Sequence, residues 1–229
     1  VVFLRPLWPP TYLGCLSGEP NLAQVLPELL KQPSREITVT PLLMSVGGHT
    51  LNDMAGDAPD VFFDVLRQAG ALEPWFGELA ALIDVPQPSC YHPEGDAYIH
   101  SMLVLHAAAQ KKAQAEKPEA FVYAALTHDL GKAISTTRGE DGEWHANGHE
   151  NTGVPLARAM LGRLGVGKEI IAYCENMCRL HMRAHVCYYV QVEAGRTNLL
   201  FDESVCPHDL ALLAVLKHGH TGNDAGIAE

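Results

Sequence analysis

Apolar residues recur at helical spacing through most of the chain beyond residue 58. In the first such stretch they fall three and four positions apart, at Val61, Phe62, Val65, Leu66 and Ala69. That spacing predicts an amphipathic helix, and the glycine that follows at position 70 is typical of a helix end. Residues 121–126 are instead almost wholly apolar, which predicts a helix buried on all sides.

Repetition of these patterns predicts an all-α fold. The expected helices span residues 60–69, 75–83, 97–115, 119–130, 150–164, 168–183 and 207–217. Residues 133–146 are polar and contain glycine, so we expect a loop there. The stretch 186–192 is the only candidate for a short strand. Helices joined by long loops around a shared core are typical of a helical bundle.

The first part of the chain has a different pattern. Several prolines interrupt it, at positions 6, 9, 10 and 20, and a Gly-Gly pair follows at positions 47 and 48. A short helix at residues 22–30 is the only element we expect there. We therefore divide the chain into an irregular N-terminal segment of unknown role, residues 1–58, and a helical domain, residues 59–229.

Composition narrows the class of protein. The chain has 229 residues, of which 47% are hydrophobic, so it can build a globular core. Its 16 Lys and Arg against 27 Asp and Glu give a net charge of −11, which argues against a broad basic surface for nucleic acid. The six cysteines form no Cys-x-x-Cys pair, and no apolar run reaches the roughly 18 residues of a membrane span. We expect reduced thiols, no membrane partner and a cytoplasmic location.

Histidines gather near the ends of the predicted helices. The chain has 12 histidines, and the pair His128-Asp129 closes the buried helix. Burying such groups without partners costs several kcal/mol, so something must satisfy them. His100, His149 and His181 also lie near predicted helix ends, which can meet at one mouth of a bundle. Imidazole and carboxylate together suit Zn, Mn, Fe, Ni or Co, and Mg less well.

Simpler interpretations apply to several of these residues. A single histidine in an apolar run is more often a hydrogen-bonded core residue than a metal ligand. We expect His145 and His185 to be solvated or to lie outside the ligand set. The remaining histidines are expected not to be ligands: His92, His106, His208, His218 and His220. Cys174 and Cys178 lie one helical turn apart and are a less favoured addition to a metal site.

Lys132 follows Asp129 by three positions, after a glycine at the helix end. It is either an ordinary surface lysine or a point charge that holds a phosphate beside the metal. A metal with open coordination positions would lower the pKa of water and create a nucleophile. The expected chemistry is therefore metal-assisted hydrolysis.

Taken together, these motifs resemble the HD superfamily of metal-dependent phosphohydrolases. His100 precedes His128-Asp129, and Gly131-Lys132 follows. Further stretches are similar to the HD region of bacterial CCA-adding tRNA nucleotidyltransferases: FFDVLRQAGAL at 62–72, YHPEGDAYIH at 91–100, and Gly148-His149-Glu150 followed by Gly153. The resemblance covers over half of the chain, with the motifs in order at compatible spacings.

The resemblance implies a helical HD domain that binds a divalent metal: Mn, Ni, Co, Fe, Zn or Mg. The metal ligands it implies are His100, His128, Asp129, His149 and His181. Asp129 and Lys132 would be the catalytic residues, and Lys132 would contact the substrate phosphate. In the multifunctional CCA enzymes, this region carries 2′,3′-cyclic phosphodiesterase, 2′-nucleotidase and phosphatase activities.

The chain departs from that family in two places. No Gly-Ser motif followed by an Asp-x-Asp pair precedes Asp60, so we do not expect CCA addition. The late aspartate that the family uses as a further metal ligand is also missing, since residues 214–218 read AVLKH. Asp209, His218, Asp224 or a water molecule would have to replace it.

Two functional hypotheses follow. In the first, the protein is a phosphohydrolase that uses a metal-activated water on a nucleotide, a cyclic phosphate or an RNA 3′ end. In the second, it is a non-catalytic HD-like remnant that binds a nucleotide, RNA or a partner protein. The missing late aspartate favours the second hypothesis, and the histidine constellation favours the first.

Overall fold

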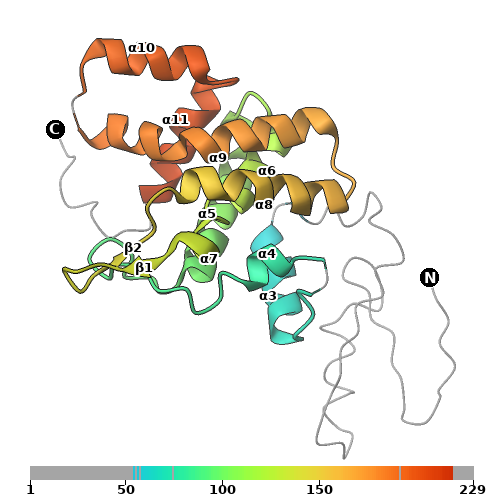
Figure 1. Cartoon of the computed structure of the whole chain (residues 1–229). Helices are drawn as coiled ribbons and strands as arrows, with labels where there is room; N and C mark the ends of the chain where they lie inside the picture. The colour runs from blue at the N-terminus through green and yellow to red at the C-terminus, as the bar shows by residue number, and fades with distance from the viewer. Residues whose placement is uncertain (1–53, 55, 57, 74, 191, 219–229) are drawn as a thin grey trace, which may run out of the picture.

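The computed structural model describes residues 54, 56, 58–73, 75–190 and 192–218. Its elements follow one another along the chain (Figure 1): α3 (Pro59–Gln68), α4 (Gly77–Ala80), α5 (Ala97–Lys111), η1 (Lys112–Gln114), α6 (Pro118–Thr127), α7 (Lys132–Ser135), β1 (Thr137–Arg138), β2 (Trp144–His145), α8 (His149–Arg163), α9 (Lys168–Tyr189), α10 (Ala194–Glu203) and α11 (Pro207–His218). The predicted all-α class is confirmed. Among these residues, no helix combines the length and the apolar character needed to cross a membrane.

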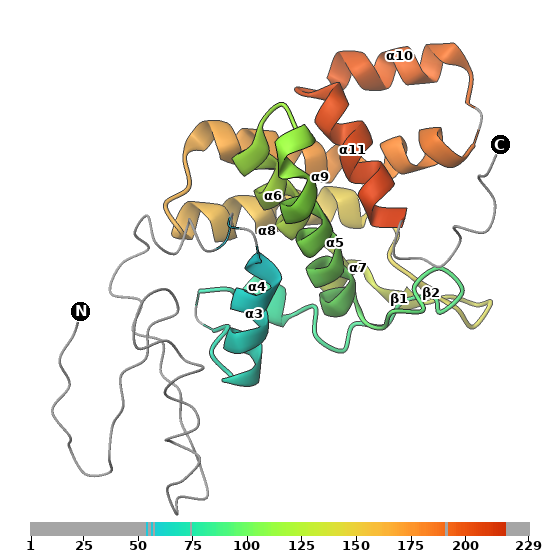
Figure 2. The same ribbon diagram turned by 180° about the vertical axis from the view of Figure 1, so that it is seen from behind.

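Helix α6 lies in the middle of the bundle. It contacts α5 and α9, while α8 packs along α9 and α11 packs on α9 as well (Figures 1 and 2). Every residue of α6 from Ala120 to Thr127 is buried, as its apolar sequence predicts. The C-terminal end of this buried helix, which carries His128-Asp129, is therefore surrounded by other helices.

Helices α3 and α4 are anchored by aromatic side chains. Phe63 packs edge-to-face against both Phe62 and Phe76, with ring centroids 5.1 Å apart in each pair. All three rings are buried, and α3 packs against α5. Gly70 follows the end of α3 and takes a left-handed conformation with φ 63°. A glycine that terminates the helix was predicted at this position.

Several local predictions were wrong. Helix α4 covers Gly77–Ala80, only part of the range predicted. The strand predicted at 186–192 is wrong, because α9 continues to Tyr189. The valine and tyrosines of this stretch favour a strand locally. Here they extend a helix whose earlier turns are already packed in the core. Residues 133–146 contain α7 and a small hairpin, and α10 was not predicted. The helix expected at 22–30 lies outside the described residues.

Asp209 joins α11 to the start of α6. Its carboxylate accepts hydrogen bonds from the backbone amides of Glu116 and Lys117 at 2.7 and 3.1 Å, and from the Tyr173 hydroxyl at 2.7 Å. Helix α6 runs ten residues from there to His128, which is about 15 Å. Asp209 is therefore a structural carboxylate and does not replace the missing late aspartate. The His218 side chain and Asp224 lie outside the part of the structure that is described.

We expect Asp209→Asn to destabilise the protein by about 3 kcal/mol at neutral pH, because it disrupts a buried, charged hydrogen-bond network. Urea unfolding measures this change, and Asp202→Asn on the exposed face of α10 should stay within about 0.5 kcal/mol of the parent. Burial alone raises the pKa of Asp209, but hydrogen bonds from Tyr173 and Glu116 outweigh it and lower that pKa.

The lowered pKa gives this prediction a pH dependence. The stability that ionised Asp209 supplies is present above the unfolded carboxyl pKa of about 4, and it is lost as the pH falls through the lower folded value. The difference between Asp209→Asn and the parent should therefore narrow below about pH 4. A difference that stayed constant down to pH 2 would contradict the role of the ionised carboxylate.

Candidate metal centre

Five buried polar side chains meet at the C-terminal end of α6. His100 comes from α5, His128 and Asp129 from the turn between α6 and α7, His149 from the start of α8, and His181 from α9. None of them is more than 5% exposed. We call these five residues the histidine–aspartate cluster; they are the five ligands that the sequence predicted.

Asp129 lies at the centre of the histidine–aspartate cluster. Its Oδ2 atom is 3.2 Å from His128 Nε2 and 3.5 Å from His100 Nε2. Its Oδ1 atom is 3.1 Å from His149 Nε2 and 3.3 Å from His181 Nε2. Each carboxylate oxygen therefore faces the Nε2 atoms of a different histidine pair.

The opposite ring nitrogen of each histidine points away from the centre. Three Nδ1 atoms lie within hydrogen-bonding distance of backbone carbonyl oxygens: His128 with Ala125 at 2.8 Å, His149 with Ala146 at 2.7 Å, and His181 with Cys178 at 2.6 Å. A carbonyl oxygen only accepts, so Nδ1 carries the proton and donates. In the neutral form, these rings present Nε2 lone pairs to the centre, as metal ligands do.

His149 Nε2 and His181 Nε2 are only 3.1 Å apart. If both atoms carry lone pairs, they repel each other unless a cation lies against both. Within the described residues, three groups have a spacing that suits a metal ion: His100, His128 and Asp129; Asp129, His149 and His181; and His92, Glu94 and His100. Burial also lowers the pKa of His100 well below its usual value, which keeps the ring neutral and able to bind a cation. The residues present therefore fit a divalent transition metal.

Two glycines let α8 approach the turn that carries Asp129. A Cβ atom placed on Gly131 would lie 2.0 Å from the His149 carbonyl oxygen and 2.6 Å from the Gly153 amide nitrogen. A Cβ atom on Gly153 would lie 2.9 Å from Cys178 Sγ. This close contact between backbones brings His149 up to Asp129.

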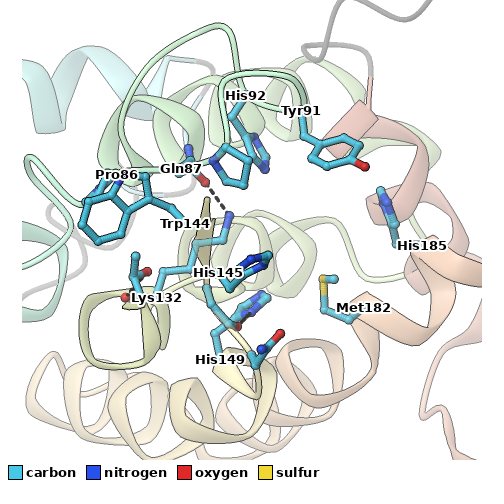
Figure 3. A pocket seen from close by; sticks show the side chains of 14 residues that line it. Pro86, Gln87, Tyr91, His92, Lys132, Trp144, His145, His149, Met182 and His185 are labelled. Atoms are coloured by element: carbon cyan, nitrogen blue, oxygen red, sulfur yellow. Dashed lines mark hydrogen bonds between the residues drawn. The ribbon is translucent and has the colours of Figure 1, made fainter. Parts of the chain in front are cut away.

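Lys132 is buried, with 6% of its side chain exposed, and its ammonium group has two partners. Nζ lies 2.7 Å from Asp129 Oδ2 and donates a hydrogen bond to Gln87 Oε1 at 2.6 Å. The second contact is visible in Figure 3. Lys132 is therefore no ordinary surface lysine. Its ammonium group lies between Asp129 of the histidine–aspartate cluster and Gln87.

Glu94 connects His100 to a further histidine, His92. Its Oε1 atom accepts hydrogen bonds from His100 Nδ1 at 2.7 Å and from His92 Nδ1 at 2.9 Å. Burial raises the pKa of Glu94, but these two hydrogen bonds outweigh it and hold that pKa well below its usual range. Glu94 is thus a carboxylate that only accepts hydrogen bonds.

A cavity of about 340 Å³ opens beside the histidine–aspartate cluster, within the size range of small-molecule sites. His149 and Lys132 form part of its wall next to the cluster. Figure 3 shows Tyr91, His92 and Trp144 around the same space. The wall thus combines one cation with several aromatic rings, which suits an anionic ligand that carries a planar group.

Among the described residues, the histidines and cysteines that the sequence did not favour as ligands lie outside the histidine–aspartate cluster. His145 and His185 line the cavity and are not members of the histidine–aspartate cluster. His106 pairs with Asp60 at 3.0 Å, far along α5 from His100. Cys178 Sγ lies 3.4 Å from the His128 carbonyl oxygen, which makes it a hydrogen-bond donor in the core. Neither Cys174 nor Cys178 belongs to a metal-binding group among the described residues.

Sequence reasoning missed two residues at the site. Glu94 lies inside the stretch that carried the family resemblance, two positions after His92, but its role depends on a loop that folds back onto α5. Gln87 lies 45 positions before Lys132 and is flanked by Pro86 and Pro88. No local pattern in the sequence connects Gln87 to Lys132.

Comparison with known proteins agrees with this geometry. The HD domain family matches residues 97–214, just over half of the chain, and this range contains the whole histidine–aspartate cluster. Residues 2–80 match a second family, cobalt chelatase (CbiK). Most of that second match lies outside the described residues.

The chain is also similar to multifunctional CCA proteins. It is 38% identical over 136 residues to those of Actinobacillus pleuropneumoniae serotype 5b and Mannheimia succiniciproducens. The identity to the protein of Pasteurella multocida is 37% over the same length. In each case the match covers 59% of this chain and 32% of the relative. The chain therefore spans about a third of the length of these relatives.

Proposed function

The chain belongs to the HD domain family, and we propose that it is a phosphohydrolase whose divalent metal is held by His100, His128, Asp129, His149 and His181. The observation that carries this proposal is the convergence of four Nε2 atoms on one buried carboxylate, with the Nδ1 atoms bonded on the outside. When bound, a divalent cation supplies a nucleophile from water at neutral pH and polarises a phosphoryl oxygen.

The residues of the chain have separate tasks in this reaction. The histidines bind the cation as neutral ligands, and Asp129 supplies the negative charge that retains it. Lys132, at the boundary between the histidine–aspartate cluster and the cavity, would contact the substrate phosphate and stabilise the charge that develops on it. Gln87 fixes the direction of the Lys132 ammonium group.

The cavity supports a nucleotide, a cyclic phosphate or an RNA 3′ end as the substrate. Its volume of about 340 Å³ suits a mononucleotide or one terminal residue of a longer chain. Tyr91 and Trp144 offer aromatic faces on which a base could stack. The similarity to multifunctional CCA proteins supports the same class of substrate.

Metal analysis combined with a hydrolysis assay tests this function. We expect the purified protein to retain a divalent metal and, with added Mn²⁺, Ni²⁺ or Co²⁺, to hydrolyse bis-p-nitrophenyl phosphate and a nucleoside 2′,3′-cyclic phosphate. A chelator should remove both the metal and the activity, and re-addition of metal should restore the activity. A metal-loaded protein without turnover on any phosphate ester would contradict the hydrolase and leave a binding role.

One observation favours a non-catalytic alternative. The Lys132 ammonium group lies 2.7 Å from Asp129 Oδ2 and can itself balance the buried charge. Under this alternative, the protein binds a nucleotide, RNA or a partner protein without cleaving it, in keeping with the missing late aspartate. The alternative predicts protein that takes up no metal from Mn²⁺, Ni²⁺ or Co²⁺ solutions and has no turnover, yet binds a nucleotide in equilibrium dialysis.

A further inference from the structure

Glu94 connects the candidate metal centre to the wall of the cavity. A single oxygen, Oε1, accepts hydrogen bonds from the Nδ1 atoms of His100 and His92. The two rings lie edge to face, with centroids 4.7 Å apart. His100 belongs to the histidine–aspartate cluster and His92 lines the cavity, where Figure 3 shows its ring. One carboxylate therefore orients one residue of each site.

The hydrogen bond determines which nitrogen of His100 faces the centre. A carboxylate only accepts, so His100 carries a proton on Nδ1, and the neutral ring then has its lone pair on Nε2. That Nε2 atom makes no hydrogen bond and lies 3.5 Å from Asp129 Oδ2. In the other three histidines of the cluster, Nδ1 donates to a backbone carbonyl oxygen instead. His100 is the one that uses a charged acceptor.

We propose that Glu94 is a positioning residue that orients His100 as a metal ligand and, through the same oxygen, fixes His92 in the wall of the substrate cavity. The inference rests on the metal centre of the proposed function. Carboxylates that accept from the far nitrogen of a ligating histidine fix its orientation and increase its basicity, and their loss weakens metal binding by about 10- to 100-fold.

Metal affinity of the purified protein tests this proposal without an activity assay. We expect Glu94→Ala to raise the Kd for Co²⁺ by about 10- to 100-fold and to change the visible absorption of bound Co²⁺. Glu94→Gln retains an acceptor oxygen, so it should restore most of the affinity. Its amide nitrogen would occupy the position of Oε2, an atom that makes no hydrogen bond.

Two controls separate this role from a general structural one. Asp60 accepts a hydrogen bond from His106 Nδ1 at 3.0 Å, so Asp60→Ala removes a similar carboxylate–histidine contact away from the centre. It should leave the Co²⁺ affinity unchanged. His92→Ala leaves the contact between Glu94 and His100 in place, so it should also bind Co²⁺ normally while raising KM for a phosphate ester. Loss of metal in His92→Ala would overturn the assignment to His100.

The histidine tautomer provides a readout that needs neither metal nor a folded variant. In the metal-free parent protein, long-range ¹H–¹⁵N spectra should show His100 protonated on Nδ1. The signal is assigned by its absence in His100→Gln or, if that variant does not fold, by through-bond correlation from the His100 backbone. A proton on Nε2, or Co²⁺ binding by Glu94→Ala within twofold of the parent, would overturn the proposal. A parent that binds Co²⁺ but hydrolyses nothing would overturn only the proposed function, and a parent that binds no metal would overturn both.

Discussion

Replacing Asp129 with alanine is expected to abolish the retention of a divalent cation and to reduce phosphate-ester hydrolysis by at least about 10²- to 10³-fold. The carboxylate lies within 3.5 Å of all four Nε2 atoms of the cluster. Without it, the four rings face the buried Lys132 ammonium group, and the carboxylate that lies between their Nε2 atoms is lost. Metal content and turnover are measured on the same preparation.

Asp202→Ala provides the control, since Asp202 is exposed on α10. It should keep the metal and the activity of the parent. Because Asp129→Ala leaves a buried ammonium group unpaired, its folding must be followed by circular dichroism, and Asp129→Asn gives a variant of nearly the same shape. A folded Asp129→Asn protein with parental metal content and turnover would show that the assignment is wrong.

Replacing Gly131 with alanine should produce the other large effect, this time through the backbone. A Cβ atom there would come within 2.0 Å of the His149 carbonyl oxygen, so the α8 helix must move away from Asp129. Gly131 has φ −63°, which alanine adopts without strain, so the clash alone causes the effect. We expect a loss of about 3 kcal/mol in stability together with weaker metal binding, because His149 moves with α8.

Gly162→Ala, within α8 itself, is the matched control. A Cβ atom at Gly162 meets nothing within 4 Å, so alanine should be neutral or stabilise α8 by up to about 1 kcal/mol. Urea unfolding and metal titration of both variants measure the two effects. A Gly131→Ala protein as stable as the parent, with unchanged metal affinity, would show that α8 does not approach the turn this closely.

The sequence identifies the buried helix and the residues at its end because both leave strong local signals. A run of apolar residues from 121 to 126 has no exposed face, and a histidine and an aspartate directly after it need partners. The sequence placed His149 and His181 near predicted helix ends; His149 does begin α8, but His181 lies within α9, which continues to Tyr189. The structure does bring all five side chains together.

Other features depend on contacts between distant parts of the chain. Gln87 contacts Lys132 across 45 positions, and Asp209 contacts the amide of Glu116 across 93. Neither pairing leaves a periodic signal. Val186 illustrates the opposite case: a β-branched residue favours a strand locally, but the packed helix before it determines its conformation.

The histidine–aspartate cluster exists only when α5, α6, α8 and α9 are packed together, since its residues come from these helices and the turn after α6. The unfolded chain offers no such arrangement, so a cation that binds there favours the native state by mass action. When the free metal concentration is 100 times the Kd, the free energy of unfolding rises by about 2.7 kcal/mol. The thermal midpoint of the protein should therefore depend on the metal supply, and a cell short of that metal would hold less of it folded.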